Sequence, residues 1–422
     1  MTSAIDLNDY DPMAREIQQN PYPYYEKLRR EEPVFRHPAS GIYFISRLDT
    51  VNTIFADPRT FSSRFSNTGT NWGSDKNELL RRLKEIEAQG QPPVDTMLTA
   101  DPPSQTRYRK TVGKAFSTKR IAALEPMIRK TTNTLIDAWP MEGRVDFMND
   151  FSIPFPVGVI ASTLNMSPKA VPNIKRWSDA SVASLGVALD DDGRLTAARD
   201  VAESHQYWTR EFEDRRANPR DDFLSELSQA LFTEDSGATR TLNFPELVSI
   251  ILQLMVAGNE TTTKLVNETV KMLIENPEQF GRIQADQSTI PNMVEEALRL
   301  SSPNQGLFRI VTKDVELEGV QVPAGSRLWV MFGAANRDER YFPDPNRFDP
   351  TRENLREHIA FGKGAHFCIG APLARLEARV CFEQLAARVA HWDFTPGQAF
   401  EYEPSYILRG LKNLDLEIQR AS

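Results

Sequence analysis

Residues 361–375 read Phe361-Gly362-Lys363-Gly364-Ala365-His366-Phe367-Cys368-Ile369-Gly370-Ala371-Pro372-Leu373-Ala374-Arg375. Cys368 closes a glycine-rich loop, and a helical pattern follows from Ala371 to about Val389. The positive end of that helix and nearby backbone N–H groups favour a thiolate over a thiol. Gly364 and Gly370 flank the cysteine and are expected to let the backbone approach a flat ligand where a side chain would collide. The segment therefore predicts a cysteine that serves as a metal ligand.

The chain has only two cysteines, which excludes a disulfide framework and favours a reducing compartment. Cys381 lies in mid-helix without a polar neighbourhood, so we expect it to be a small, inert core residue. Zinc is the alternative metal for Cys368, but a zinc site needs about three more Cys or His ligands. The nearby His358 and His366 do not supply them.

Composition points to a globular protein without nucleic acid or membrane partners. Hydrophobic residues make up 40% and charged residues 26% of the 422 positions, and the formal net charge is −8. A negative net charge argues against binding to duplex nucleic acid. The N-terminus is polar and acidic, unlike a signal peptide, and the longest apolar region, Val248 to Gly258, is interrupted by Gln253. A soluble, cytoplasmic protein is expected.

One helix is predicted to be unusually long. Asn243 and Glu246 form a capping-box pattern around Pro245, and helical periodicity then continues to Asn276-Pro277. Such a helix would be roughly 50 Å long at 1.5 Å per residue. A helix of this length in a globular protein is expected to cross the core.

The β-structure is confined to smaller parts, about 34–60 and 305–335. Gly41 to Ile45 predicts a short strand, and Asp314 to Val330 predicts paired strands with a turn at Pro323-Ala324-Gly325. Residues 340–366 have little periodicity and predict a long irregular segment. We therefore expect residues 1–422 to form a single domain that is mainly α with a smaller β-rich part.

Residues 361–375 closely resemble the haem-binding loop of the cytochrome P-450 family. Ala257-Gly258-Asn259-Glu260-Thr261-Thr262 is similar to the oxygen-activation motif of that family, and the likeness extends from about Asn20 to Leu414. The resemblance implies the cytochrome P-450 fold, with the long central helix over a haem b whose iron is bound by Cys368. A thiolate ligand favours O–O bond cleavage over reversible oxygen binding.

The resemblance also assigns roles to individual residues. Glu260 and Thr261 would relay protons to bound dioxygen, and Gly258 would leave a groove for that dioxygen. Charged or hydrogen-bonding partners for the haem propionates are needed. The residues implied in cofactor binding are Gln105, Arg109, Gly258, Arg309, Phe361, His366 and Gly370. Many family members have a histidine where this chain has Gln105.

Glu296 and Arg299 resemble the buried Glu-x-x-Arg pair of the family. The resemblance ties this pair to Asn336-Arg337-Asp338 and to Arg347 and gives it a structural role on the proximal side of the haem. Glu295, one residue away, points to a different helical face.

The implied activity is that of a haem-dependent monooxygenase. Two external electrons would come from NAD(P)H through a ferredoxin reductase and a ferredoxin, because no flavin or iron–sulfur motif is present. An acidic ferredoxin would dock on a basic patch of Arg107, Lys110, Lys114, Lys363 and Arg379. The substrate is expected to be small and mainly hydrophobic, in a pocket with Trp72, Leu185, Leu254, Leu307, Phe308 and Ile407. A peroxide-dependent peroxygenase and a non-catalytic haem-binding sensor remain alternatives.

Overall fold

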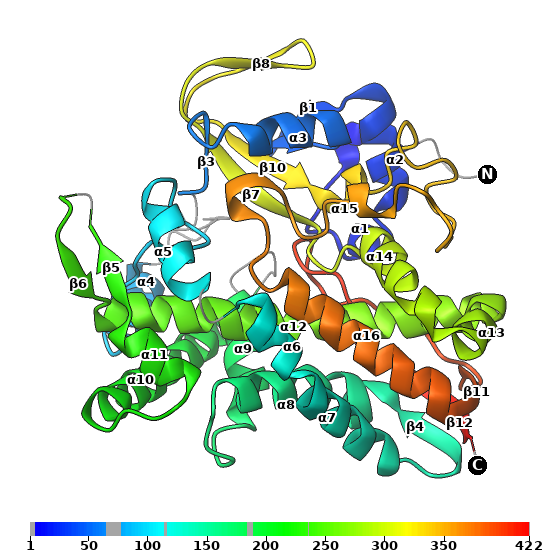
Figure 1. Cartoon of the computed structure of the whole chain (residues 1–422). Coiled ribbons are helices and arrows are strands. Elements are labelled where there is room, and N and C mark those ends of the chain that lie inside the picture. Colours follow the sequence, from blue (N-terminus) through cyan, green and yellow to red (C-terminus); the bar gives the residue numbers. More distant parts are fainter. Residues whose placement is uncertain (1–4, 65–76, 114–115, 184–188, 235, 422) are drawn as a thin grey trace.

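The computed structural model describes residues 5–64, 77–113, 116–183, 189–234 and 236–421. Helices form most of the molecule, and the strands gather in smaller sheets (Figure 1). The helices are α1 Arg15–Gln19, α2 Tyr22–Glu31, α3 Leu48–Ala56, α4 Asn77–Glu87, α5 Ser104–Gly113, α6 Thr118–Ala123, α7 Glu125–Asp137, α8 Pro154–Thr163, α9 Asn173–Ala183, α10 Asp191–Ala217, α11 Phe223–Gln229, α12 Phe244–Glu275, α13 Pro277–Ala285, α14 Ile290–Ser301, α15 Phe332–Ala335 and α16 Ala371–Arg388. The strands are β1 Val34–Arg36, β2 Tyr43–Ile45, β3 Phe61–Ser62, β4 Glu142–Asp146, β5 Leu231–Thr233, β6 Thr239–Thr241, β7 Gly306–Val311, β8 Val315–Leu317, β9 Val320–Val322, β10 Arg327–Met331, β11 Val389–Phe394 and β12 Asp415–Arg420.

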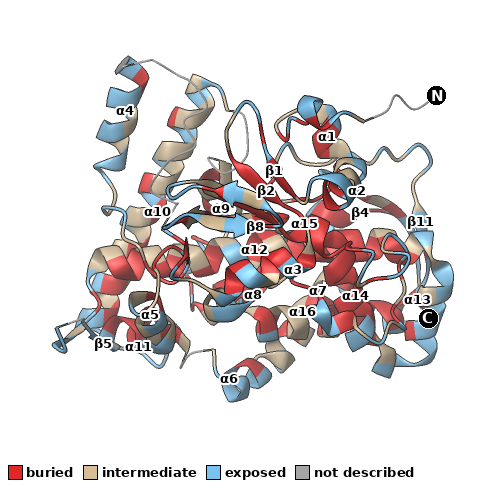
Figure 2. Cartoon of the chain, turned by 90° about the horizontal axis from the view of Figure 1, so that it is seen from above, coloured by how far each residue is buried: buried red, intermediate tan, exposed pale blue. Residues whose placement is uncertain are grey.

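The long helix α12 crosses the core, as predicted (Figure 1). Its capping box is complete, because Asn243 Oδ1 accepts from the Glu246 N–H at 3.0 Å and Glu246 Oε2 accepts from the Asn243 N–H at 2.7 Å. The helix packs against α8, α9, α14 and α16. Seen from above, buried residues concentrate on α12, α14 and α16 (Figure 2). These three helices support the cysteine loop.

The main sheet has five strands in the order β1-β2-β10-β7-β3. A turn lies at Pro323-Ala324-Gly325, as predicted, where the Ser326 N–H donates to the Pro323 carbonyl at 3.1 Å. It does not join the hairpin β8–β9, which turns at Glu318 and Gly319. Both of these residues have positive φ, at 49° and 80°, as a tight two-residue hairpin turn requires. Pro323 to Gly325 instead lead into β10, which pairs with β7 and β2.

Other elements depart from the predicted division into α and β. The part 34–60 contains helix α3 as well as strands. A separate three-stranded sheet, β11-β12-β4, joins residues far apart in the sequence and was not predicted. The amphipathic helix α4 lies beside α10 (Figure 2).

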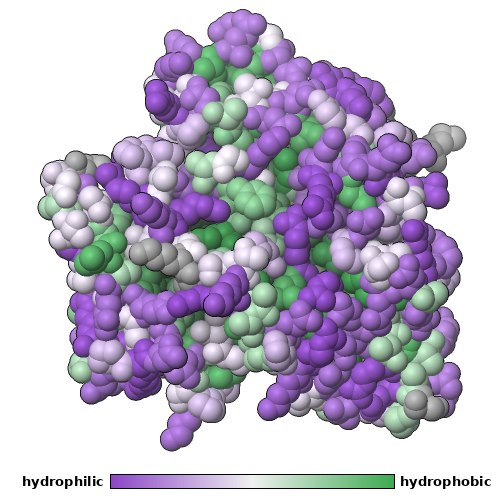
Figure 3. Space-filling model, in the orientation of Figure 1, coloured by the Kyte–Doolittle hydropathy of each residue, from purple (hydrophilic) through white to green (hydrophobic). Residues whose placement is uncertain are grey.

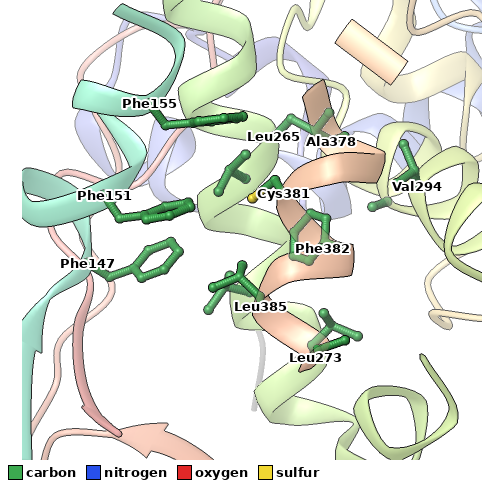
Figure 4. Close-up of a cluster of buried hydrophobic side chains, with 14 of the residues drawn as sticks. Phe147, Phe151, Phe155, Leu265, Leu273, Val294, Ala378, Cys381, Phe382 and Leu385 are labelled. Carbon is green, nitrogen blue, oxygen red and sulfur yellow. The ribbon is translucent and has the colours of Figure 1, made fainter. Parts of the chain in front are cut away.

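Cys381 lies where the sequence placed it, in the hydrophobic core of α16. Figure 4 shows it among Phe151, Phe382 and Leu385, between α16 and α12. Burial raises the pKa of its thiol well above the ordinary value. Cys381 is therefore an inert core residue.

The face drawn in Figure 3 is largely hydrophilic, and hydrophobic side chains gather in a hollow near its centre. This hollow lies between the main sheet above and the helices α12 and α16 below (Figures 1 and 3). Among the described residues, no helix combines the length and the apolar character needed to cross a bilayer.

Candidate functional site

The cysteine loop is held by its own backbone. The Cys368 N–H donates to the Phe361 carbonyl at 2.9 Å, and helix α16 begins at Ala371. Gly362 and Gly364 have φ of 65° and 67°, where a side chain is strained. A Cβ on Gly364 would lie 2.6 Å from the Phe55 carbonyl oxygen, so this glycine makes room for the end of α3. The close approach predicted at Gly364 is therefore to α3, whereas a Cβ on Gly370 would lie 3.8 Å from Cys368 Sγ.

Burial and the nearby positive groups have opposite effects on the pKa of Cys368. Burial raises the pKa of its thiol, while the N–H groups of Gly370 and Ala371 and the charges of Arg109 and Arg375 lower it. Burial has the larger effect on the pKa, and the N–H groups at the helix start oppose it in the predicted direction. A bound cationic metal deprotonates a coordinating thiol outright. The two backbone N–H groups then stabilise the sulfur charge.

Arg375 fastens the loop to helix α14. Its guanidinium donates to both oxygens of Glu295, at 2.6 and 2.8 Å, and lies 4.6 Å above the ring centre of Phe361. His358 Nε2 is 2.9 Å from the same carboxylate. Burial opposes ionisation of Glu295, but these partners lower its pKa to about 2. The sequence set Glu295 aside as lying on another face, and that face turns out to be the one next to the cysteine loop.

The Glu296–Arg299 pair is buried, as predicted. Both side chains are fully buried, with Arg299 Nη2 and Glu296 Oε1 2.7 Å apart. Arg299 also donates to the carbonyls of Asn336 and Arg347. Arg347 thus contributes its backbone, and the second guanidinium on Glu296 is that of Arg352, at 3.1 Å.

Three of the predicted propionate partners come together. Arg109 and Arg309 both lower the pKa of His366, which burial and these charges bring to about 4. His366 Nε2 lies 3.0 Å from Ser63 Oγ. Asp101 is the nearby anion, and it also accepts from the Ser63 N–H at 2.7 Å.

Gln105 has a different contact from the one expected. Its side chain is buried, and Nε2 donates to the Ala365 carbonyl at 2.7 Å. Gln105 therefore braces the cysteine loop from helix α5. An amide is suited to this contact because it donates without carrying a charge.

The residues present fit a haem. Arg309 is only 3% exposed, and its guanidinium donates to the Phe308 carbonyl at 2.7 Å. Within the described part of the chain it forms no salt bridge, and burial lowers its pKa to about 10. A buried cation without a close anionic partner is costly. The two carboxylates of a haem are groups that would complete such a site.

The two residues predicted to relay protons have different surroundings. Thr261 is half-buried, and its hydroxyl donates to the Ala257 carbonyl at 2.6 Å. Glu260 is 3% exposed and contacts Lys264 at 2.9 Å and Lys175 at 3.3 Å. Ala257 is exposed and Gly258 half-buried, although α12 runs through the core. The centre of the helix is thus partly exposed.

Other clusters and cavities give weaker evidence for a functional site. Among the described residues, no group of three or more His, Cys, Asp or Glu is arranged to hold a metal ion. An open groove of about 750 Å³ between α4 and the start of α10 is lined by residues such as Glu78, Arg82 and Asp191, none of them from the cysteine loop. Of the expected pocket residues, Trp72 and Leu185 lie outside the described residues, as does Lys114 of the basic patch. Leu254, Phe308 and Ile407 are buried, Leu307 is half-buried, and all four pack in hydrophobic clusters.

Comparisons with known proteins agree with this site. The family model for cytochrome P450 matches residues 194–389. The chain is 33% identical to the cytochrome P450 monooxygenase PikC of Streptomyces venezuelae, over 99% of this chain and 96% of that protein. It is 34% identical to a vitamin D(3) 25-hydroxylase of Pseudonocardia autotrophica, over 94% and 93%.

A solved structure extends the likeness to three dimensions. Cytochrome P450 CYP109Q5 from Chondromyces apiculatus superposes with a TM-score of 0.84 at 35% identity, covering 99% of this chain and 100% of that one. The peroxygenase and sensor alternatives are not favoured by relatives that are monooxygenases and hydroxylases. The chain belongs to the cytochrome P450 family and is a haem-dependent monooxygenase of small organic molecules.

Proposed function

We propose that this enzyme hydroxylates a mainly hydrophobic small molecule at a haem b held by Cys368. The observation that carries the proposal is the buried Arg309, which lies with Arg109 and His366 beside the cysteine loop and has no salt bridge among the described residues. The haem, when bound, supplies oxygen activation and the oxidation of a C–H bond. Arg109, Arg309 and His366 would bind its propionates, Gly370 would admit it close to the sulfur, and Phe361 would support the loop.

Residues on the α12 side of the haem, where dioxygen would bind, are proposed to move protons. Thr261 holds a hydroxyl at the accessible centre of α12, and Glu260 is the neighbouring carboxylate. In our proposal Thr261 would supply a hydrogen-bond donor where dioxygen is activated, and Glu260 would resupply the proton. Gly258 leaves the space in which these groups meet the oxygen. Positioned general acids contribute about 10²–10⁴ in rate.

The class of substrate follows from apolar surroundings and from relatives. A relative that is 34% identical is a vitamin D(3) 25-hydroxylase, and vitamin D(3) is an apolar small molecule. The buried Leu254, Phe308 and Ile407 supply apolar surface near the proposed pocket. We therefore propose a mainly apolar small molecule in preference to a small charged acid.

Electrons are proposed to arrive from NAD(P)H through a ferredoxin reductase and an acidic ferredoxin. The docking surface is narrower than the sequence suggested, because Arg379 is paired with Glu125 and Glu383. Lys110 and Lys363 remain exposed near the loop, and Lys363 donates to the neutral side chain of Asn52 at 3.0 Å. A reducing compartment, the cytoplasm, is proposed on the two free cysteines.

A spectrum tests the central assignment. The reduced, carbon monoxide-bound protein should show the strongly red-shifted Soret band of a thiolate-bound haem, and Cys368→His should lose that band while still binding haem. The matched control is Cys381→Ser, which removes the other thiol and should keep the band. A red-shifted band that survives in Cys368→His would overturn the assignment.

A further inference from the structure

Lys264 lies one helical turn after Glu260 on α12, and its side chain is 4% exposed. Its Nζ is 2.9 Å from Glu260 Oε2 and 2.8 Å from Glu403 Oε2. Glu403 belongs to the segment between β11 and β12, where Tyr406 and Ile407 pack against Phe308. One buried ammonium group therefore connects the central helix to a segment about 140 residues further on.

The backbone of that segment is shaped around the lysine. A Cβ on Gly410 would overlap Lys264 Cγ, so only glycine leaves room for the lysine stem. The Glu403 N–H donates to the Gly410 carbonyl at 2.9 Å, which holds the glutamate next to the glycine. The lysine, the glutamate and the glycine thus form one fitted arrangement.

Glu260 has a cation on each oxygen. Oε1 is 3.3 Å from Lys175 of α9, which also pairs with Asp179, and Oε2 faces Lys264. Burial opposes ionisation of Glu260, but the two lysines outweigh it and lower its pKa. The carboxylate is thereby held charged and fixed in place.

A fixed carboxylate must leave a lysine before it can take part in proton transfer. Leaving Lys264 would ordinarily strand a buried ammonium without a carboxylate partner, which is strongly unfavourable. Glu403 removes this cost, because it stays 2.8 Å from the same nitrogen. The second carboxylate therefore makes the first one releasable.

We propose that Lys264 and Glu403 are positioning residues for Glu260: Lys264 holds its carboxylate, and Glu403 retains the lysine when that carboxylate moves. The inference rests on the proposed role of Glu260 in proton delivery. It predicts that removing the two residues has opposite effects on the pKa of Glu260. Lys264 is a cation and Glu403 is an anion near the same carboxylate. The other charged groups that face this cluster, Lys175 and Asp179, are unchanged in the test.

The experiment measures the pKa of Glu260 in the substrate-free haem protein. Infrared spectra are recorded across pH, and the Glu260 band is assigned by subtraction of Glu260→Gln. Lys264→Met should raise this pKa by about 1 to 3, and Glu403→Gln should lower it. The control is Glu401→Gln on the same segment, an exposed glutamate 3.4 Å from Lys412, which should leave the pKa unchanged.

Turnover gives the second measurement. Glu403→Gln should release more hydrogen peroxide per NAD(P)H and increase the solvent isotope effect, because Glu260 leaves Lys264 less readily. Gly410→Ala displaces the lysine without changing a charge, so it should shift the Glu260 pKa in the direction of Lys264→Met. This variant and Glu403→Gln carry the test if Lys264→Met does not fold.

Shifts of the pKa in the same direction for Lys264→Met and Glu403→Gln, or no shift in either, would overturn the inference. Failure of the proposed function gives a different result. In that case Glu260→Gln would itself leave coupling and the isotope effect unchanged. If Glu260→Gln is uncoupled but the Lys264 and Glu403 variants leave the pKa of Glu260 unchanged, only the positioning role is removed.

Discussion

The carboxyl group of Glu377, on α16, is hydrogen-bonded to Thr262 of α12 in the interior of the protein. Thr262 follows directly after Thr261, and Glu377 lies on the helix that begins beside Cys368. No basic side chain pairs with Glu377 within the described residues, and burial raises its pKa to about 8. A neutral carboxylic acid therefore joins the two helices that carry the proposed chemistry.

This acid should make stability depend on pH. Its pKa is about 8 in the folded protein against 4.5 ordinarily, so the folded state holds the extra proton between these values. The stabilisation is complete below the ordinary pKa and is lost as the pH rises through about 8, by at most about 1.4 kcal/mol per pH unit. Glu377→Gln should flatten this decline in urea unfolding of the haem protein between about pH 5 and pH 8. An equal decline in Glu377→Gln and the parent protein would contradict the assignment; Glu401→Gln is the exposed control.

The buried Glu296–Arg299 pair predicts a large loss of stability on removing one partner. Glu296→Ala leaves Arg299 without its carboxylate, which costs about 3–5 kcal/mol. Arg299 also donates to the carbonyls of Asn336, Pro345 and Arg347, so replacing both residues by methionine should recover only part of the loss. Urea midpoints of the single and double variants check this. A single variant within about 1 kcal/mol of the parent would contradict it.

Local signals predicted much of this structure. The capping pattern at Asn243 and Glu246 set the start of α12, and Asn276-Pro277 set its end, because caps and prolines act within a few residues. The cysteine loop was recognisable for the same reason. The sheet β11-β12-β4 was not predicted, since its pairing joins residues such as Val145 and Leu416 that no local pattern connects.

The contacts inside the site were harder to predict than its members. Arg109, Arg309 and His366 were named and do come together. The acceptor of Gln105 and the two lysines on Glu260 depend on how separate segments pack, which helical spacing cannot give. Glu295 was set aside because its face pointed away from Glu296, although that face carries the bond to Arg375.

Gln105 offers a test of how the cysteine loop is held. Gln105→Glu replaces the donor to the Ala365 carbonyl by an acceptor, so a buried hydrogen bond is lost and two oxygens face each other. The expected cost is about 1–3 kcal/mol, seen as faster haem transfer to an excess of apomyoglobin. Gln105→His retains an N–H donor and should lose haem more slowly than Gln105→Glu. Equal rates for the two variants would show that the hydrogen bond does not hold the loop.

The exposed Lys363 tests the docking of the electron donor. Lys363→Ala should slow reduction by an acidic ferredoxin at low salt, and the difference from the parent should vanish as ionic strength rises, because added salt screens exposed charges. Lys84→Ala on α4 is the control, an exposed lysine far along the chain from the loop. The CO-bound spectrum should be unchanged in both. A salt-independent defect in Lys363→Ala would point to a disturbed loop instead of lost docking.

Thr261 tests the proton relay directly. Its hydroxyl donates to the Ala257 carbonyl at 2.6 Å, a bond that α12 does not need, since alanine is a strong helix former. Thr261→Ala should therefore retain haem and bind substrate, yet product formed per NAD(P)H should fall roughly tenfold or more as electrons appear in hydrogen peroxide. Thr261→Ser keeps the hydroxyl and should stay close to the parent. The measurement is a simultaneous assay of NAD(P)H, dioxygen, peroxide and product. If coupling in Thr261→Ala matches that in Thr261→Ser, the hydroxyl is not part of the proposed proton path. Its bond within the helix would then be its only role.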